Sequence, residues 1–324
     1  MKNPLPGPDT LTPTLSQGRG GTGEREKSEF RILGRAAGEE SIRFEYRGVA
    51  FDQECFHVVA GLNAVDTRDY VEQTFKALEQ AGQVCARMGA YKPRTSPYSF
   101  QGYGKQCLPY VFELAGKHGI RVISMEVTRD EHLDEIREAL RQAGGATGVM
   151  LQIGTRNTQN FELLKTVGLQ REFPIMVKRG FGITLHESLL AAEYVASSGN
   201  RDIVFCLRGM KTNFGDPHRN LVDFAHVPVV KRLTRMPVCI DPSHSVGIRA
   251  SAPDGLQDIF HVAAQGIIAG ANLVLTDIHP EPRKALVDAG QALTLEELPR
   301  FLEDCAIARE AYEKRRGLRS AKGD

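Results

Sequence analysis

Short apolar runs, rich in β-branched residues, recur along most of the chain. There are eight of them, and their starting points lie 26 to 36 residues apart. Such runs are typical of strands in a sheet that is buried on both faces. The eight runs are Phe56–Ala60, Ala90–Lys92, Arg121–Met125, Val149–Ile153, Ile175–Lys178, Ile203–Leu207, Pro237–Asp241 and Leu273–Asp277.

Between these runs, apolar residues recur at helical spacing. Strands that alternate with helices predict parallel βαβ units. Eight units over about 265 residues fit a closed (β/α)8 TIM barrel better than an open sheet. The helical stripes are Val71, Phe75, Leu78 and Cys85; Leu133, Ile136 and Leu140; Leu185, Leu189, Ala192 and Val195; and Leu256, Ile259, Ala263 and Ile267.

Composition changes sharply near Ser28. Residues 1–28 contain four prolines and five glycines with almost no large apolar side chain, so we expect a disordered tail. The segments FRIL and IRFEYRGVAF predict a short β element or hairpin ahead of the barrel. We therefore expect a single barrel over residues 29–315 and a frayed basic C-terminus over residues 316–324.

The overall charge excludes some partners. Lys and Arg total 41 against 40 for Asp and Glu, a net charge of +1, which argues against a basic nucleic-acid binder. No stretch approaches the roughly 20 apolar residues of a membrane helix, and the N-terminus has no signal-peptide core. The six cysteines form no CxxC motif and mostly lie in apolar runs, which indicates a reducing cytoplasm.

Polar residues follow every predicted strand, at the end of a barrel where active sites are built. Five cations gather at this rim, and together they have the charge to hold two phosphate groups. Arg179 and Lys211 come next to two of them and are expected to face outward, because neighbours on a strand alternate. The five cations are Lys92, Arg94, Arg156, Lys178 and Arg208.

A second group of polar residues follows the last two runs. His244, Asp277 and Asp288, with His279 as a further candidate, offer an imidazole and two carboxylates for a divalent metal. The alternative is that His244 is a neutral acid–base or substrate contact and that no metal binds.

Several segments resemble 3-deoxy-7-phosphoheptulonate (DAHP) synthases of the type I-beta group. The resemblance extends from about residue 31 to 315, and the broader superfamily includes 3-deoxy-octulosonate 8-phosphate (KDO8P) synthase. The segments are KPRTSPYSFQGYG (92–104), LQIGTRNTQNFELLK (151–165), VKRG (177–180), DPSH (241–244) and HPEPRKAL (279–286).

The resemblance implies a condensation of phosphoenolpyruvate with erythrose 4-phosphate, with a (β/α)8 barrel as the fold. Lys92, Lys178 and Arg208 match positions that hold phosphoenolpyruvate, and Lys92 and His244 are the expected catalytic residues. The other expected substrate-binding residues are Arg94, Thr95 and Ser96, which match the part that meets the sugar phosphate, together with Gln152 and Arg156.

The metal site departs from the family pattern. Asn63 stands where DAHP synthases carry a Cys ligand, and Asp277 stands where they carry Glu; only His244 and Asp288 match. An amide is a weaker ligand than a thiolate, so we expect either no required cofactor or a weakly bound divalent metal such as Mn²⁺. GLNAVDTRD (61–69) and NFGDPHRNLVDF (213–224) resemble metal-independent KDO8P synthases instead.

Three functions stay open. The first is DAHP synthesis that needs little or no metal. The second is a homologue that uses another aldehyde, such as arabinose 5-phosphate, and the third is a catalytically inactive barrel that binds a phosphorylated metabolite. Residues 1–48 are too few for the regulatory domain that group members often carry, and we expect a cytoplasmic homo-oligomer.

Overall fold

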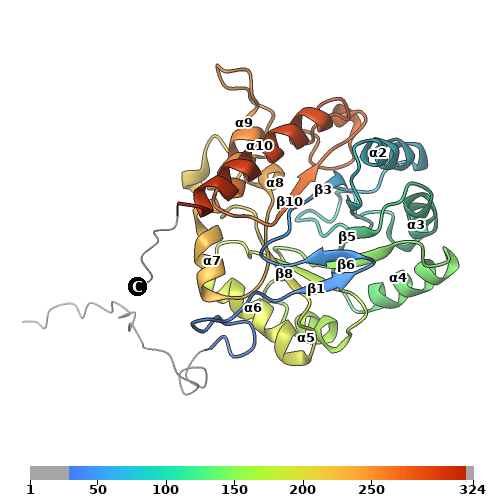
Figure 1. Cartoon of the computed structure of the whole chain (residues 1–324). Coiled ribbons are helices and arrows are strands. Elements are labelled where there is room, and N and C mark those ends of the chain that lie inside the picture. The colour runs from blue at the N-terminus through green and yellow to red at the C-terminus, as the bar shows by residue number, and fades with distance from the viewer. Residues whose placement is uncertain (1–28, 319–324) are drawn as a thin grey trace, which may run out of the picture.

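The computed structural model describes residues 29–318, and their centre is a closed barrel of eight parallel strands (Figure 1). Each strand pairs with the next along the chain, and β10 closes the ring against β3. The predicted TIM barrel is therefore confirmed. Its strands are β3 (His57–Leu62), β4 (Cys85–Met88), β5 (Val122–Val127), β6 (Gly148–Ile153), β7 (Ile175–Lys178), β8 (Ile203–Leu207), β9 (Val238–Ile240) and β10 (Leu273–Asp277).

Helices surround the barrel, and local signals start several of them. Thr67 caps the first by accepting a hydrogen bond from the Tyr70 amide, and Thr184 and Glu187 form a capping box on another. The helices are α2 (Arg68–Gln80), α3 (Leu108–Lys117), α4 (Glu131–Gln142), α5 (Phe161–Leu169), α6 (Leu185–Ser198), α7 (Val227–Leu233), α8 (Pro242–Val246), α9 (Asp258–Ile268) and α10 (Leu298–Arg316). None of those between residues 29 and 318 has the length and apolar character that crossing a bilayer requires.

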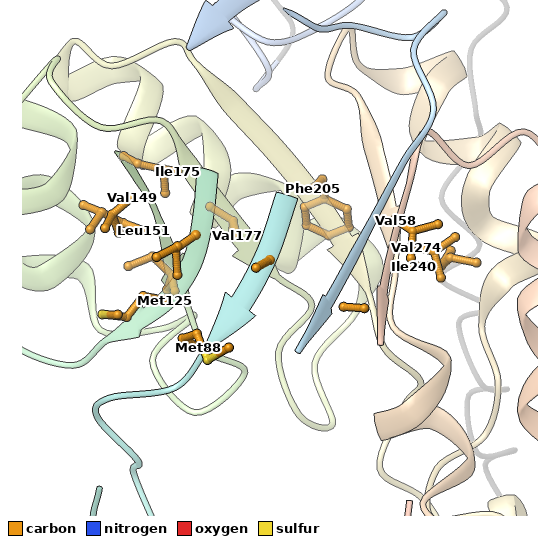
Figure 2. Close-up of a cluster of buried hydrophobic side chains, with 14 of the residues drawn as sticks. Val58, Met88, Met125, Val149, Leu151, Ile175, Val177, Phe205, Ile240 and Val274 are labelled. Atoms are coloured by element: carbon orange, nitrogen blue, oxygen red, sulfur yellow. The ribbon is translucent and has the colours of Figure 1, made fainter. Parts of the chain in front are cut away.

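Alternation along the strands separates two apolar layers. One set of side chains packs between the strands and the helices, and Figure 2 shows part of it, including Val149, Leu151 and Phe205. The other set fills the barrel interior toward the amino ends of the strands, as Cys85, Met150, Met176 and Cys239 do. Two residues further along, the interior positions become polar: Arg87, Gln152, Lys178 and Asp241. The interior thus has an apolar floor beneath a charged upper layer.

An antiparallel hairpin closes the floor from below. It consists of β1 (Phe44–Tyr46) and β2 (Val49–Phe51), which confirms the β element expected from IRFEYRGVAF. Phe44 and Phe51 stack with ring centroids 5.1 Å apart, and both belong to the apolar cluster of the barrel interior. The hairpin therefore covers the amino end and leaves the carboxyl end open for chemistry.

The structure corrects several predictions about local structure. The second strand is Cys85–Met88, not Ala90–Lys92, and Cys85 belongs to this strand, not to the preceding helical stripe. Arg87 interrupts the apolar pattern there because it points into the charged upper layer of the barrel. FRIL (30–33) forms no strand, and helix α10 continues through Arg316. The expected tail of residues 1–28 and the end of the basic C-terminus, 319–324, lie outside the described residues.

Candidate active site

The carboxyl end of the barrel contains a cavity of about 280 Å³. Its lining includes seven cationic side chains but only two carboxylates, those of Glu126 and Asp288. Burying so much unpaired positive charge raises the free energy of the fold unless a bound anion neutralises it. The cationic residues are Arg87, Lys92, Arg94, Arg156, Lys178, Arg208 and Arg219.

Arg208, directly after β8, is the clearest incomplete group of this cavity. Its side chain is 2% exposed, and Nη1 has no hydrogen-bond partner among the described residues. No described carboxylate lies within ion-pair distance of it, and burial lowers the pKa of its guanidinium. A buried cation without a counter-charge is a site prepared for an anionic ligand.

Lys178 and His244 share one buried carboxylate. Lys178 Nζ donates to Asp241 Oδ2 at 2.8 Å, and Nδ1 of His244 lies 3.1 Å from Asp241 Oδ1. Burial lowers the pKa of His244 to about 4, so its ring is neutral near pH 7. With Nδ1–H donating to Asp241, Nε2 is left as a proton acceptor. Asp241, which caps the short helix α8, thus orients both groups that line the cavity.

Asn63 links three charged groups. Its side-chain oxygen accepts hydrogen bonds from Lys92 Nζ at 2.8 Å and Arg87 Nη2 at 2.6 Å, and its Nδ2 donates to Asp288 Oδ2 at 2.7 Å. The loops after β3 and β4 lie so close together that position 89 requires glycine. A Cβ there would lie 2.0 Å from the Asn63 carbonyl oxygen. Burial and the nearby Arg87 lower the pKa of Lys92 to about 8.

The expected metal ligands lie together. His244 is 3.8 Å from a carboxylate oxygen of both Asp277 and Asp288, but their oxygens already have partners. Asp277 Oδ1 pairs with Arg87, and its Oδ2 accepts from Gln291 at 2.6 Å. In residues 29–318, no group of three or more His, Cys, Asp or Glu side chains has a geometry suited to a metal ion. A guanidinium amid these oxygens, with an amide in place of a thiolate, does not fit a tightly bound transition metal.

Asp288 nevertheless carries signs of a functional position. Its backbone adopts a left-handed φ of 51°, which is strained for a residue other than glycine. Burial opposes ionisation of its carboxyl, yet His244, Arg219 and Lys92 together lower the pKa to about 2. Arg219 lies 3.3 Å from its other oxygen. Asp288 therefore stays ionised at the edge of the cation cluster.

An aromatic ring contacts two of the rim cations and also Lys211, which is exposed and does not line the cavity. Phe181 follows β7, and the side chains of Arg208, Arg156 and Lys211 lie 4.9, 5.2 and 5.7 Å from its ring centroid. The negative ring face attracts cations, and it offers no carboxylate that would neutralise them. Phe181 therefore assembles positive charge that stays available to a ligand.

Most of the predicted site residues line this one cavity. Thr95, Ser96 and Arg94 do so, and Arg156 donates to Thr95 Oγ1 at 3.2 Å. Gln152 is an exception, because it lies in the barrel interior and donates to Ser124 at 2.6 Å.

His279 and Arg179 serve the structure instead. His279 pairs with Asp66 at 3.4 Å and accepts a hydrogen bond from the Glu281 amide, so both ring nitrogens already have partners. Arg179 points away from the cavity as expected, but it is buried and pairs with Asp223 at 3.1 Å.

Sequence reasoning missed two cationic residues of the cavity. Arg87 lies within β4 and Arg219 in the loop after β8, so neither directly follows an apolar run. A charged residue in an otherwise apolar run was the available signal for Arg87. Arg219 had none, because its loop returns to the rim only in the folded chain.

Comparison with known proteins agrees with this geometry. The model of the DAHP synthetase I family matches residues 42–312. The chain belongs to this family. The curated phospho-2-dehydro-3-deoxyheptonate aldolase of Thermotoga maritima is 36% identical over 267 residues, which cover 82% of this chain and 74% of the relative. The crystal structure of that DAHP synthase superposes with a TM-score of 0.76 at 35% identity, covering 86% of this chain and 77% of the other.

This member of the DAHP synthetase I family also matches a second solved structure and an octulosonate-type aldolase. A truncated form of the Thermotoga maritima synthase superposes with a TM-score of 0.74 at 31% identity. The superposition covers 88% of this chain and 98% of the other. The 2-dehydro-3-deoxyphosphooctonate aldolase of Syntrophobacter fumaroxidans is 28% identical over 289 residues, covering 83% of this chain and 94% of the relative. The family's barrel thus accounts for nearly all of the described residues.

Proposed function

We propose that the protein condenses phosphoenolpyruvate with erythrose 4-phosphate to form 3-deoxy-7-phosphoheptulonate, the first step of the shikimate pathway. Arg208 carries the proposal, because its buried guanidinium has no counter-charge until an anion binds. Family membership supplies the reaction. The surrounding cations hold two phosphorylated substrates close together, and this proximity offsets their mutual repulsion.

The reaction needs one nucleophilic attack and one addition of water. Carbon 3 of phosphoenolpyruvate attacks the aldehyde carbon, and the aldehyde oxygen takes a proton from the Lys92 ammonium. Water then adds to the electron-poor carbon 2, and Nε2 of His244 accepts its proton. As the C2–O bond breaks, its electron pair leaves on phosphate and the C2 hydroxyl gives its proton to the Lys92 amine, which restores the ammonium and produces the ketone. His244 passes its proton to the departing phosphate. Lys92 is suited to proton donation because its pKa is about 8.

We propose that this chemistry needs no resident metal. The family resemblance implies a divalent ion, but Arg87 occupies the space between Asn63 and Asp277 and donates to both. A guanidinium there supplies positive charge at the position where a metal would supply it. Lys92 and Arg87 together then stabilise the negative charge that develops on the aldehyde oxygen.

Arabinose 5-phosphate is the second candidate aldehyde. Asn63 and the 28% identity with an octulosonate-type aldolase favour it, whereas the KPRTSP segment and the 36% identity with a heptulosonate-type aldolase favour erythrose 4-phosphate. A phosphate-release assay with phosphoenolpyruvate and a panel of aldehydes decides between them. We expect the highest kcat/KM with erythrose 4-phosphate. Turnover with arabinose 5-phosphate alone would favour the second function, and no turnover with any aldehyde would leave an inactive binding barrel.

Assembly and location follow from the same proposal. We propose a homo-oligomer that acts in the cytoplasm, where both phosphorylated substrates are available. All six cysteines are free thiols, five of them buried, which suits a reducing compartment. Size-exclusion chromatography with light scattering tests the oligomeric state.

A further inference from the structure

A second basic cleft lies at the opposite end of the barrel. It has a volume of about 1140 Å³ and is bounded by the segment before β3, the ends of α7, α9 and α10, and residues 35–43. Figure 1 shows α7 and the end of α10 on the same side of the barrel. The segments that carry Gln53, Lys231 and Ile268 each lead into a strand, so this cleft faces the amino ends of the strands. We refer to it as the basal cleft.

The basal cleft has an excess of positive charge. Six cationic side chains line it against three carboxylates. Glu54 is neutralised by Arg316, whose Nη1 and Nη2 lie 2.5 and 3.1 Å from its two oxygens. Asp52 lies 3.5 Å from Arg43. The cleft therefore keeps cations for which its own carboxylates provide no partner.

Lys231 is the central one of these cations. In the part of the chain that the structure describes, no carboxylate lies within 4.0 Å of its Nζ, which donates a long hydrogen bond of 3.5 Å to the Gln53 carbonyl. Burial and the nearby Arg309 lower its pKa to about 8, although the Glu54 carboxylate opposes this shift. The protein thus maintains a half-buried ammonium among like charges, which is unfavourable until an anion reaches it.

Lys231 does not serve to neutralise the carbonyl groups at a helix C-terminus. Positive side chains often complement the carbonyls at helix C-termini, and three helices end at this cleft. Arg315 does so by donating to the Ile268 carbonyl at 2.7 Å, and Arg35 does so by donating to the Lys231 carbonyl at 2.8 Å. Lys231 Nζ donates to no helix carbonyl, so its charge remains directed at the cleft.

An aromatic ring organises the basal cleft much as Phe181 organises the active site. Arg309, Arg316 and Lys231 lie 5.1, 5.7 and 5.8 Å from the Tyr312 ring centroid. Pro228 and Ile268 add apolar surface to the lining. A cation cluster beside apolar and aromatic surface suits an organic anion better than a simple inorganic ion.

We propose that the basal cleft is a second ligand site, which binds a small organic polyanion with at least two negative charges on phosphate or carboxylate groups. Lys231 and Arg232 bind its charges, and Tyr312 contacts its apolar part. Such a ligand would bridge α7, α9 and α10 and so stabilise the folded barrel. The inference does not depend on the condensation reaction at the other end.

The chain contains no tryptophan, so Tyr312→Trp creates a reporter confined to this cleft. Citrate, an organic anion with three carboxylates, is the probe, and the readout is tryptophan fluorescence of the full chain. We expect a saturable change that weakens at least about tenfold when Lys231→Met or Arg232→Gln is added. Lys314→Gln is the matched control, because Lys314 lies in the last turn of α10, pairs with Glu310 at 2.6 Å and does not line the cleft.

Binding at the active site is separated by adding Arg208→Met, which we expect to leave the tryptophan signal unchanged. No saturable change, or equal affinity in the Lys231→Met and Arg232→Gln variants, would overturn the proposal. Circular dichroism and the unfolding temperature establish that each variant folds. Ala225→Trp, at an exposed position of the cleft, provides a second reporter if Tyr312→Trp does not fold.

Discussion

The side-chain oxygen of Asn63 lies 2.8 Å from Lys92 Nζ, in the hydrogen bond that joins the first and second strand exits of the barrel. Asn63 also accepts from Arg87 and donates to Asp288. An amide can do both at once, whereas a thiolate ligand could only accept. The residue that departs from the family's metal-binding pattern thus holds together the cations of the active site.

Restoring the missing ligands should create a metal site. We expect Asn63→Cys combined with Asp277→Glu to bind Zn²⁺ at least about tenfold more tightly than the unmodified chain, because a thiolate is a stronger ligand than an amide. Competition with a chelating dye measures the affinity. Asn63→Ser with Asp277→Glu is the control, since it lacks the sulfur. Equal affinities in the two double variants would mean that position 63 does not face the metal position.

Arg208 should dominate the binding of phosphoenolpyruvate. We expect Arg208→Met to weaken it about 30- to 100-fold, or about 2 to 3 kcal/mol, because a charge-assisted bond to a buried guanidinium is lost. Isothermal titration calorimetry measures this change. Arg201→Met, at an exposed position before β8, should leave the affinity unchanged. An unaltered dissociation constant for Arg208→Met would remove Arg208 from the phosphoenolpyruvate site.

The pH dependence should report Lys92. Its pKa is about 8, so the ammonium that binds and protonates substrate is present below this pH and is lost as pH rises through it. We therefore expect kcat/KM, which reflects the free enzyme, to fall above pH 8. Lys92→Arg should lower kcat/KM, because a guanidinium does not release the proton, and the residual activity should show no decline near pH 8. A decline at the same pH in the Lys92→Arg variant would assign it to another group.

Phe181 should act through the cations that surround it. We expect Phe181→Leu to raise KM for phosphoenolpyruvate about 5- to 20-fold, since Arg156 and Arg208 lose the ring against which they lie. Phe181→Tyr keeps the ring and should behave like the unmodified chain. Steady-state kinetics of the two variants measures the effect, and equal KM values for both would show that the ring contributes only packing.

The fold was largely predictable because burial on both sides gives most barrel strands an uninterrupted apolar run. The run Ile175–Lys178 is a strand as expected, and Lys178 reaches the site from its last position. The strand Cys85–Met88 was misplaced for the opposite reason, since Arg87 lies inside the run and faces the charged interior. Patterns of apolar residues detect strands best where no functional residue interrupts them.

The sequence predicted the site residues that follow the strands, but not the hydrogen bonds that join them. Lys92, Lys178 and Arg208 follow directly from the rule that barrel active sites lie at the carboxyl ends of strands. The link from Asn63 to Arg87, Lys92 and Asp288 depends on three loops meeting in space, which no spacing along the chain reveals. The basal cleft was likewise invisible, because its charges come from helix ends far apart in sequence.

If Arg87 and Lys92 supply the positive charge that the reaction needs, the condensation proceeds without a resident metal. The most direct measurement is phosphate release from phosphoenolpyruvate and erythrose 4-phosphate by protein dialysed against EDTA, with and without added Mn²⁺. We expect the same rate in both conditions, because Arg87 and Lys92 provide the positive charge. Activity that disappears with EDTA and returns with Mn²⁺ would show that the reaction depends on a bound metal.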